Sequence, residues 1–166
     1  MINIEVPKQI IKKFHRNSKI KIKFEIDIDP PENFYEDTKF LYQPIPFSVK
    51  TMSIEDLFAG KMHCVLFREW KERVKGRDWY DFVWFVARKT SLRLGHLESR
   101  SKKSGHIGKN AKLSEDSIKK LLIEKINKVD FDKAKSDISM FIKDPDSVKV
   151  WSKEFFLDVV SRLKIE

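Results

Sequence analysis

The sequence predicts an α+β protein in which a small mixed sheet is followed by a predominantly helical bundle. Strict alternation of apolar and charged residues over 19–29 is typical of a strand, and a second strand is expected over 47–51. From Ser53 onward, apolar residues recur at the spacing of helices, behind Ser or Asp residues that can cap them. We therefore expect a sheet region over residues 1–52 and a helical region over residues 53–166.

The first predicted strand has one apolar face and one charged face. The apolar face is formed by Ile20, Ile22, Phe24, Ile26 and Ile28. The charged face carries Glu25, Asp27 and Asp29, and Pro30-Pro31 ends the strand because proline cannot donate to a sheet ladder. The carboxylates are candidate metal ligands, or they form a solvated face that offsets nearby lysines, and the pattern leaves both open. The stretch between the two strands is expected to be a loop.

A helix is predicted to begin after Ser53, a good N-cap that has Asp56 three residues later to complete a capping box. Its apolar arc is formed by Ile54, Leu57, Phe58, Met62 and Val65. At about 100° per residue, Lys61 falls within that arc. Because burial of an unpaired ammonium costs several kcal/mol, we expect Lys61 either to meet an anion or to extend its stem to water.

A second helix follows a charged turn that ends at Gly76, and Asp78 is its expected N-cap. Large apolar residues make this helix apolar nearly all round, which is typical of a buried helix. Asp78 and Asp81 share one face near the positive N-terminus, and Arg77 can reach Asp81 four residues on. We expect Lys61 and Asp78 to approach each other or to open into one cleft, since Asp78 is the nearest expected counter-charge.

Further helices are expected over residues 90–100, 115–128, 130–142 and 153–163. The last three have apolar stripes along one face, which is typical of helices that form a core. We expect no chemistry from them.

Positive charge is concentrated in one segment. The formal net charge is +9, and most of the excess falls in residues 88–128. Within it, the Gly-, Ser- and Lys-rich stretch from Arg100 to Lys112 predicts a mobile basic loop that is able to meet phosphates. A solvated linker without a partner is an equally good interpretation of this stretch.

The composition indicates a globular protein, because 41% of the residues are hydrophobic and 36% are charged. The single Cys64 excludes a disulfide framework and favours a reducing compartment, where we expect it to be a small buried residue. No apolar run approaches the roughly 20 residues of a membrane span, and the N-terminus lacks a signal-peptide pattern. We therefore expect a cytoplasmic protein.

Two motifs, in this order, resemble one known family. The stretches SIEDLFAGKMHCVLFR (53–68) and GRDWYDFVWFVAR (76–88) are similar to the C-terminal half of the AbiEii/AbiGii toxin nucleotidyltransferases. These are bacterial abortive-infection and type IV toxin-antitoxin proteins with a polymerase-β-like nucleotidyltransferase fold. The resemblance covers roughly Lys19 to His106 and continues more weakly to the C-terminus. It implies that residues 1–52 form part of the nucleotidyltransferase sheet.

The resemblance assigns roles to individual residues. In the family, a helix of the form E-x-x-x-x-K-x-x-A carries a nucleotide-contacting lysine, which Lys61 matches. A following R-D-x-x-D helix carries a functional aspartate, which Arg77, Asp78 and Asp81 match. The resemblance therefore implies that Lys61 and Arg77 hold a nucleoside triphosphate, with Lys61, Asp78 and Asp81 as the catalytic set.

The resemblance also implies Mg²⁺, because transferases of this fold hold two divalent metals with carboxylates from neighbouring strands. In the family the first two carboxylates follow a Gly-Ser turn, and Glu25 or Asp27 best matches a third acidic residue on a later strand. None of the five glycines is followed by Ser, and none precedes Asp27. The Gly-Ser signature is therefore absent from these residues.

Two functional hypotheses stay open. The first is a nucleotidyltransferase toxin that transfers a nucleotide from a triphosphate to an RNA or protein acceptor, and that is inactive alone without a Gly-Ser and D-x-D half. The second is a basic module without catalysis that binds RNA, such as tRNA, or an antitoxin through residues 88–128. In the second hypothesis, Lys61 and Asp78 form a buried structural salt bridge. An upstream reading frame that encodes Gly-Ser and D-x-D would favour the first.

Overall fold

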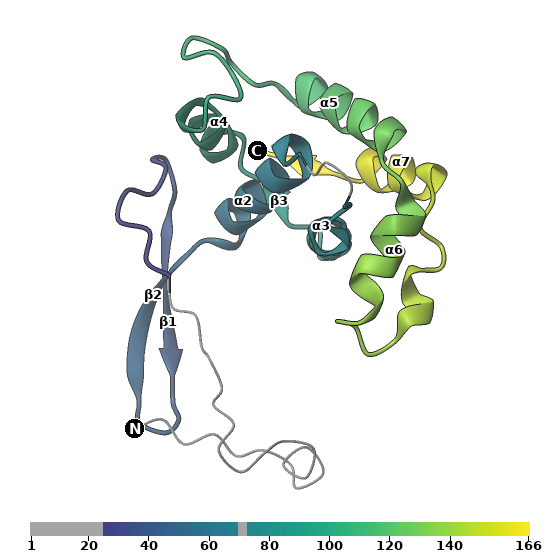
Figure 1. Cartoon of the computed structure of the whole chain (residues 1–166). Helices are drawn as coiled ribbons and strands as arrows, with labels where there is room; N and C mark the ends of the chain where they lie inside the picture. Colours follow the sequence, from purple (N-terminus) through teal and green to yellow (C-terminus); the bar gives the residue numbers. More distant parts are fainter. Residues whose placement is uncertain (1–24, 70–72) are drawn as a thin grey trace, which may run out of the picture. The chain divides into compact units, whose positions relative to one another are not determined.

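The computed structural model describes residues 25–69 and 73–166, and the chain divides into the units Met1–Pro30 and Pro31–Glu166 (Figure 1). In the first unit, the described residues 25–30 form no strand. Asp27 Oδ1 accepts a hydrogen bond from the Asp29 N–H at 3.1 Å, and Ile26 and Ile28 are exposed. The predicted strand is therefore wrong over 25–29, where a local side-chain turn takes the place of ladder bonds. Residues 19–24 lie outside the described part.

The Pro31–Glu166 unit begins with an antiparallel hairpin of β1 (Glu36–Leu41) and β2 (Phe47–Met52). The second predicted strand is thus confirmed, but its partner lies in a stretch that we expected to be a loop. The stretch from Glu36 to Lys39 is polar on both faces, so it has no alternation to reveal it. Its strand conformation comes from pairing with β2, from Glu36 opposite Met52 to Leu41 opposite Phe47.

The hairpin leads directly into α2 (Ile54–Phe67). Ser53 caps this helix as predicted, since its Oγ accepts a hydrogen bond from the Asp56 N–H at 3.2 Å. The buried Asp56 carboxylate does not close a capping box on Ser53 N–H. It accepts hydrogen bonds from the Tyr35 N–H and the Ser53 hydroxyl, both at 2.7 Å, and pairs with Arg93 at 3.0 Å. Asp56 therefore fixes the end of the hairpin to the start of α2.

The second predicted helix is α3 (Gly76–Ala87), which begins two residues before the expected cap Asp78. A carboxylate from α6 (Phe131–Ser139) serves this terminus instead, because Asp137 Oδ2 accepts a hydrogen bond from the Gly76 N–H at 3.0 Å. A Cβ at Gly76 would overlap the Ala134 carbonyl oxygen of α6. Glycine therefore allows the close packing of α3 on α6, and the Asp78 side chain is used elsewhere.

The remaining elements are β3 (Ser91–Leu92), α4 (Leu94–Lys103), α5 (Glu115–Lys128), the 3₁₀ helix η1 (Pro145–Val148), α7 (Lys153–Ser161) and β4 (Lys164–Ile165). Helix α2 contacts α3 and α4, α3 contacts α6, and α5 contacts α7 (Figure 1). In the core, the Trp79 ring meets the Phe131 and Phe156 rings edge-on, with centroids 5.3 and 4.9 Å apart. The helices, together with two small two-stranded sheets among the described residues, confirm the α+β class.

Helices α4, α5, α6 and α7 are found where the sequence predicted helices, but the ends of α4, α6 and α7 differ from the predicted ones. The helix over 115–128 is confirmed, whereas the one expected over 90–100 begins only at Leu94. Leu92 pairs with Ile165 across the parallel β3–β4 sheet, and this tertiary contact replaces the first helical turn. Residues 100–103 belong to α4, so the basic loop begins at Ser104. In the described part of the chain, no helix has the length and apolar character needed to cross a membrane.

Candidate functional site

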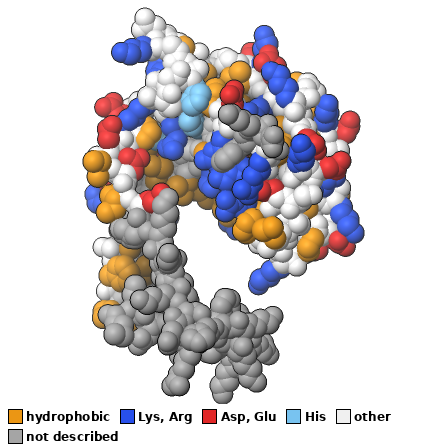
Figure 2. All heavy atoms as spheres, viewed as in Figure 1, with side chains coloured by type: hydrophobic (Ala, Val, Ile, Leu, Met, Phe, Trp, Pro, Cys, Tyr) orange, Lys and Arg blue, Asp and Glu red, His pale blue; other side chains and the backbone are white. Residues whose placement is uncertain are grey.

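A cavity of about 750 Å³, here called the main cavity, is lined by residues of α2, α3, α4 and the end of α6. Its cationic lining residues are Lys61, Arg68, Lys75, Arg77 and Arg100, and its acidic ones are Asp56, Asp78 and Asp81. Figure 2 shows Lys and Arg side chains gathered on one part of the surface, with hydrophobic side chains beside them. The volume lies within the range of roughly 300–1,000 Å³ that is typical of small-molecule sites.

Helix α2 presents one stripe of side chains to the main cavity. Leu57, Lys61, Cys64 and Arg68 at the C-cap recur three or four residues apart, and Gly60 lies beside them. Lys61 lies beside the buried arc of α2 rather than inside it, since its side chain is 48% exposed. Its Nζ is 2.6 Å from Asp81 Oδ2. Lys61 therefore meets an anion, which is one of the two expected outcomes, but the anion is Asp81 and not the expected Asp78.

Asp78 pairs with Arg68 and not with Lys61. Arg68 Nη1 donates to both carboxylate oxygens, at 2.9 and 3.2 Å, and the Asp78 side chain is only 9% exposed. Lys61 and Asp78 nevertheless line the same cavity, as expected. The sequence could not choose between Asp78 and Asp81 as the partner of Lys61, because the two share one face of α3. Their distances to α2 depend on how the two helices pack.

Arg77 and Arg100 line the main cavity, and neither has an ion pair with a described residue. The Arg77 guanidinium lies over the Phe141 ring, 5.0 Å from its centroid, instead of reaching Asp81. Arg100, which the sequence placed in a loop, comes from the last turn of α4, and its buried Nε has no hydrogen-bond partner in the part of the chain described. Both guanidinium groups are therefore available to an anionic ligand.

The carboxylates of the main cavity are poorly suited to Mg²⁺. Each of Asp56, Asp78 and Asp81 is already paired with an Arg or Lys side chain. Over residues 25–69 and 73–166, no group of three or more His, Cys, Asp or Glu side chains is placed to hold a metal ion. These residues therefore do not fit the ion that the resemblance implies, which prefers several oxygen ligands. Glu25 and Asp27 belong to the other unit, and their role as metal ligands stays a prediction.

Many cations of the basic segment 88–128 are engaged within the fold. Arg88 lies over Trp84, Arg93 pairs with Asp56 and Glu166, Lys102 pairs with Glu98, and Lys119 pairs with Glu115. Arg100 lines the main cavity, and Lys125 and Lys128 line a smaller hollow. Lys109 and Lys112 are exposed on the basic loop, so this segment offers positive charge both at the two hollows and on the loop.

One histidine next to Arg100 is neutral at pH 7. Burial, together with Arg100, His106 and Arg68, lowers the pKa of His63 from its usual 6.5 to about 4. The Ser104 hydroxyl lies 2.9 Å from His63 Nε2 and 2.6 Å from His106 Nδ1. His63 therefore contributes structure but no positive charge near the cavity.

A comparison with known protein families finds the same family that the motifs lining this cavity resemble. A family model described as "Nucleotidyl transferase AbiEii toxin, Type IV TA system" matches residues 2–159, which is most of the chain. No curated protein and no solved structure matches the chain significantly. The chain belongs to the AbiEii nucleotidyl transferase toxin family of type IV toxin-antitoxin systems.

Proposed function

We propose that the main cavity binds the triphosphate of a nucleotide, with Lys61, Arg77 and Arg100 as the cations that hold it. The observation that carries this proposal is the position of Lys61: it lines a cavity of nucleotide size together with Arg77 and Arg100, whose guanidinium groups have no carboxylate partner among the described residues. Charge-assisted hydrogen bonds from Arg and Lys to phosphate oxygens are among the stronger contacts in proteins.

The cavity also offers an apolar wall to a nucleobase. Tyr80 and Phe141 are partly exposed aromatic side chains that line it, together with Ile138 and Ile142. Stacking of a base on an aromatic ring contributes about 1–3 kcal/mol and accepts every base. This wall supports nucleotide binding, and it does not select a particular base.

The two aspartates of the motif act as positioning residues in this proposal. Asp81 holds the Lys61 ammonium on the wall until a phosphate replaces it, and Asp78 holds the Arg68 guanidinium between α2 and α3. The acceptor that we propose is RNA or protein, as for a nucleotidyltransferase, and an antitoxin is the proposed partner.

We propose further that these residues alone do not transfer nucleotides. Transfer by this fold requires carboxylates that hold metal ions around the triphosphate, and the cavity carboxylates are all engaged with cations. The sequence also carries no Gly-Ser turn. The carboxylate set that completes the reaction must therefore come from outside the main cavity.

The test uses the purified chain with magnesium, each of the four labelled nucleoside triphosphates and total RNA. We expect measurable nucleotide binding that Lys61→Ala weakens about tenfold, and no label in RNA or protein. Lys50→Ala is the matched control, because Lys50 is an exposed lysine paired with Glu36 on the hairpin. Label that is transferred by the wild type and lost with Lys61→Ala would refute the inactivity, and equal nucleotide binding by both variants would refute the site.

A binding module without catalysis is the second candidate. It is favoured by the pairing of Asp78, whose buried carboxylate and Arg68 partner have the geometry of a structural ion pair. This candidate predicts that Lys61→Ala leaves nucleotide binding unchanged while the chain still binds RNA or an antitoxin. The nucleotide-binding assay therefore separates the two candidates.

A further inference from the structure

A second hollow of about 170 Å³ adjoins the main cavity and is called here the α5 hollow. The two share the lining residues Cys64, Arg68, Lys75 and Asp78. Three cationic residues line the α5 hollow and not the main cavity: Arg73, just before α3, and Lys125 and Lys128, in the last turns of α5. Asp78 is its only lining carboxylate in the described part of the chain. The described lining residues of the α5 hollow therefore include more cationic than anionic side chains.

The contacts of these side chains show which charges are available. Arg73 pairs with Asp137, and Arg68 pairs with Asp78, so a carboxylate neutralises each guanidinium. Lys125 Nζ donates one hydrogen bond, of 3.1 Å, to the Arg68 carbonyl oxygen. Neither Lys125 nor Lys128 has an ion pair with a described residue. These two ammonium groups are therefore available to an anion that enters the hollow.

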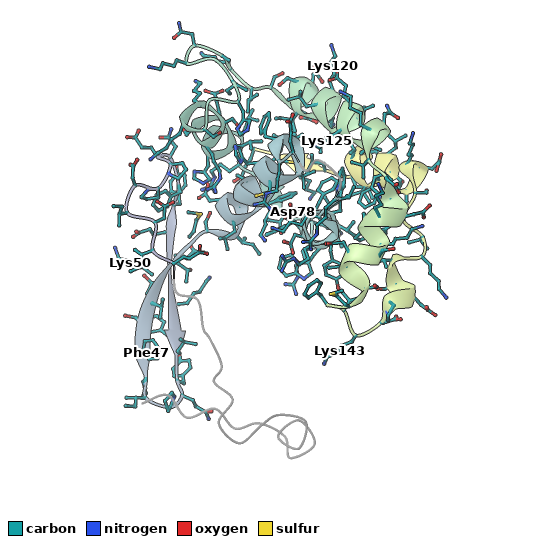
Figure 3. All side chains as sticks on the ribbon, viewed as in Figure 1. Phe47, Lys50, Asp78, Lys120, Lys125 and Lys143 are labelled. Atoms are coloured by element: carbon teal, nitrogen blue, oxygen red, sulfur yellow. The ribbon has the colours of Figure 1, made fainter. Side chains whose placement is uncertain are left out.

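Lys125 is held in this place at a cost in free energy. It is half-buried, and burial lowers the pKa of its ammonium below the usual 10.5, while Lys128 lowers it further and Glu69 opposes the shift. A partly desolvated ammonium next to a second ammonium is stabilised when an anion enters between them. Figure 3 shows the contrast with Lys120, which extends from the same helix away from the Asp78 region.

The volume of the hollow limits what the anion can be. About 170 Å³ is room for a few water molecules at roughly 30 Å³ each. This is well below the roughly 300 Å³ at which small-molecule sites begin. A single phosphate group with its oxygens fits this volume.

We propose that the α5 hollow is a phosphate-group subsite, in which Lys125 and Lys128 hold one backbone phosphate of a polynucleotide strand. Arg68 and Asp78 line both this hollow and the main cavity, so a strand bound here has its end next to the nucleotide site. That the bound strand is the acceptor of the nucleotide rests on the proposed function. Phosphate binding by Lys125 and Lys128 does not depend on it.

The test measures binding of a fluorescein-labelled single-stranded oligoribonucleotide, and separately of inorganic phosphate, to the full chain and three variants. These are Lys125→Gln, Lys128→Gln and the control Lys120→Gln, which removes the same charge from α5 outside the hollow. We expect Lys125→Gln and Lys128→Gln each to raise the oligonucleotide Kd about five- to tenfold, and Lys120→Gln to change it less than twofold. The slope of log K against log salt should fall by about 0.7 for each hollow variant.

The outcomes separate this proposal from the proposed function. Nucleotide triphosphate binding should respond to Lys61→Ala and not to Lys125→Gln, so either site can fail without the other. If Lys125→Gln and Lys128→Gln weaken the binding of inorganic phosphate and leave oligonucleotide binding unchanged, the hollow does not bind a polynucleotide. It would then be a site for a small phosphate. Equal effects of the Lys125, Lys128 and Lys120 substitutions on both ligands would overturn the subsite. Thermal unfolding verifies that each variant is folded. If Lys125→Gln unfolds the chain, Lys128→Gln provides the test, because Lys128 is more exposed.

Discussion

The Lys61 ammonium and the Asp81 carboxylate lie 2.6 Å apart across the two central helices, whereas Asp78, three residues before Asp81, pairs with Arg68. The two aspartates of the R-D-x-x-D motif therefore have separate cations, both from the same stripe of α2. The two pairs differ in burial, since the Asp78 side chain is 9% exposed and the Asp81 side chain 32%. Because of this difference, we expect loss of the Asp78 charge to affect mainly stability, and loss of the Asp81 charge to affect mainly ligand binding.

Removal of the Asp81 charge should strengthen nucleotide binding. Asp81 competes with a phosphate for the Lys61 ammonium, and exposed pairs of this kind contribute roughly 0.2–1 kcal/mol. We expect Asp81→Asn to lower the Kd of a nucleoside triphosphate about two- to fivefold, and Lys61→Ala to raise it about tenfold, as measured by calorimetric titration. Weaker binding by Asp81→Asn would show instead that Asp81 orients Lys61 toward the nucleotide.

Removal of the Asp78 charge should mainly destabilise the fold. Asp78→Asn leaves the partly buried Arg68 guanidinium without its counter-charge, and the loss of one partner of a buried pair costs more than that of a surface pair. We expect a decrease of about 2 kcal/mol in the free energy of unfolding in urea. Asp81→Asn is the matched control and should change it by less than about 1 kcal/mol. Equal losses for the two variants would contradict the burial argument.

Replacement by alanine should have opposite effects on stability at Gly76, in α3, and at Gly60, in α2. A Cβ at Gly76 overlaps the Ala134 carbonyl oxygen, whereas a Cβ at Gly60 has Arg100 Nη1 as its nearest neighbour, at 3.9 Å. We expect Gly76→Ala to lower the free energy of unfolding by about 1–3 kcal/mol, because packed backbone must move. Gly60→Ala should raise it by about 0.5–1 kcal/mol, because alanine favours the helix. The comparison is made by thermal and urea unfolding, and a stabilised Gly76→Ala would show that α3 and α6 are not packed this closely.

His63 should make stability fall in mild acid. Its pKa in the fold, about 4, is below the 6.5 of the unfolded chain, so the unfolded chain binds a proton first. The stabilising contribution is present above pH 6.5 and is lost progressively as the pH falls toward about 4. We expect a loss on the order of 1–2 kcal/mol, less than the full shift implies because the ring is partly exposed.

The measurement compares urea unfolding of the wild type and His63→Gln at pH 7.5 and pH 5. The variant has no imidazole at this position, so its stability should fall less between the two pH values. The same pH dependence in both proteins would assign the effect to other groups.

Local patterns in the sequence were sufficient for most of the helices. The cap at Ser53, the apolar spacing of α2 and α3, and the stripe of α5 all reflect interactions within a few residues, which sequence periodicity reports directly. The motif around Lys61, Asp78 and Asp81 likewise indicates the family from local sequence alone. The spacing predicted that Lys61 either meets an anion or extends its stem to water, and both are seen: its Nζ is 2.6 Å from Asp81, and its side chain is 48% exposed.

Only the tertiary structure decided which groups meet. The strand β1 has no alternation and exists because β2 pairs with it, and the anion at the start of α3 is Asp137, 61 residues away along the chain. Lys61 takes Asp81 instead of Asp78, and Lys125 faces a hollow while Lys120 does not, because helix packing fixes the distances between side chains on different elements. Periodicity assigns a residue to a face of its own helix, but the partner of that face depends on contacts between distant segments, which no local pattern contains.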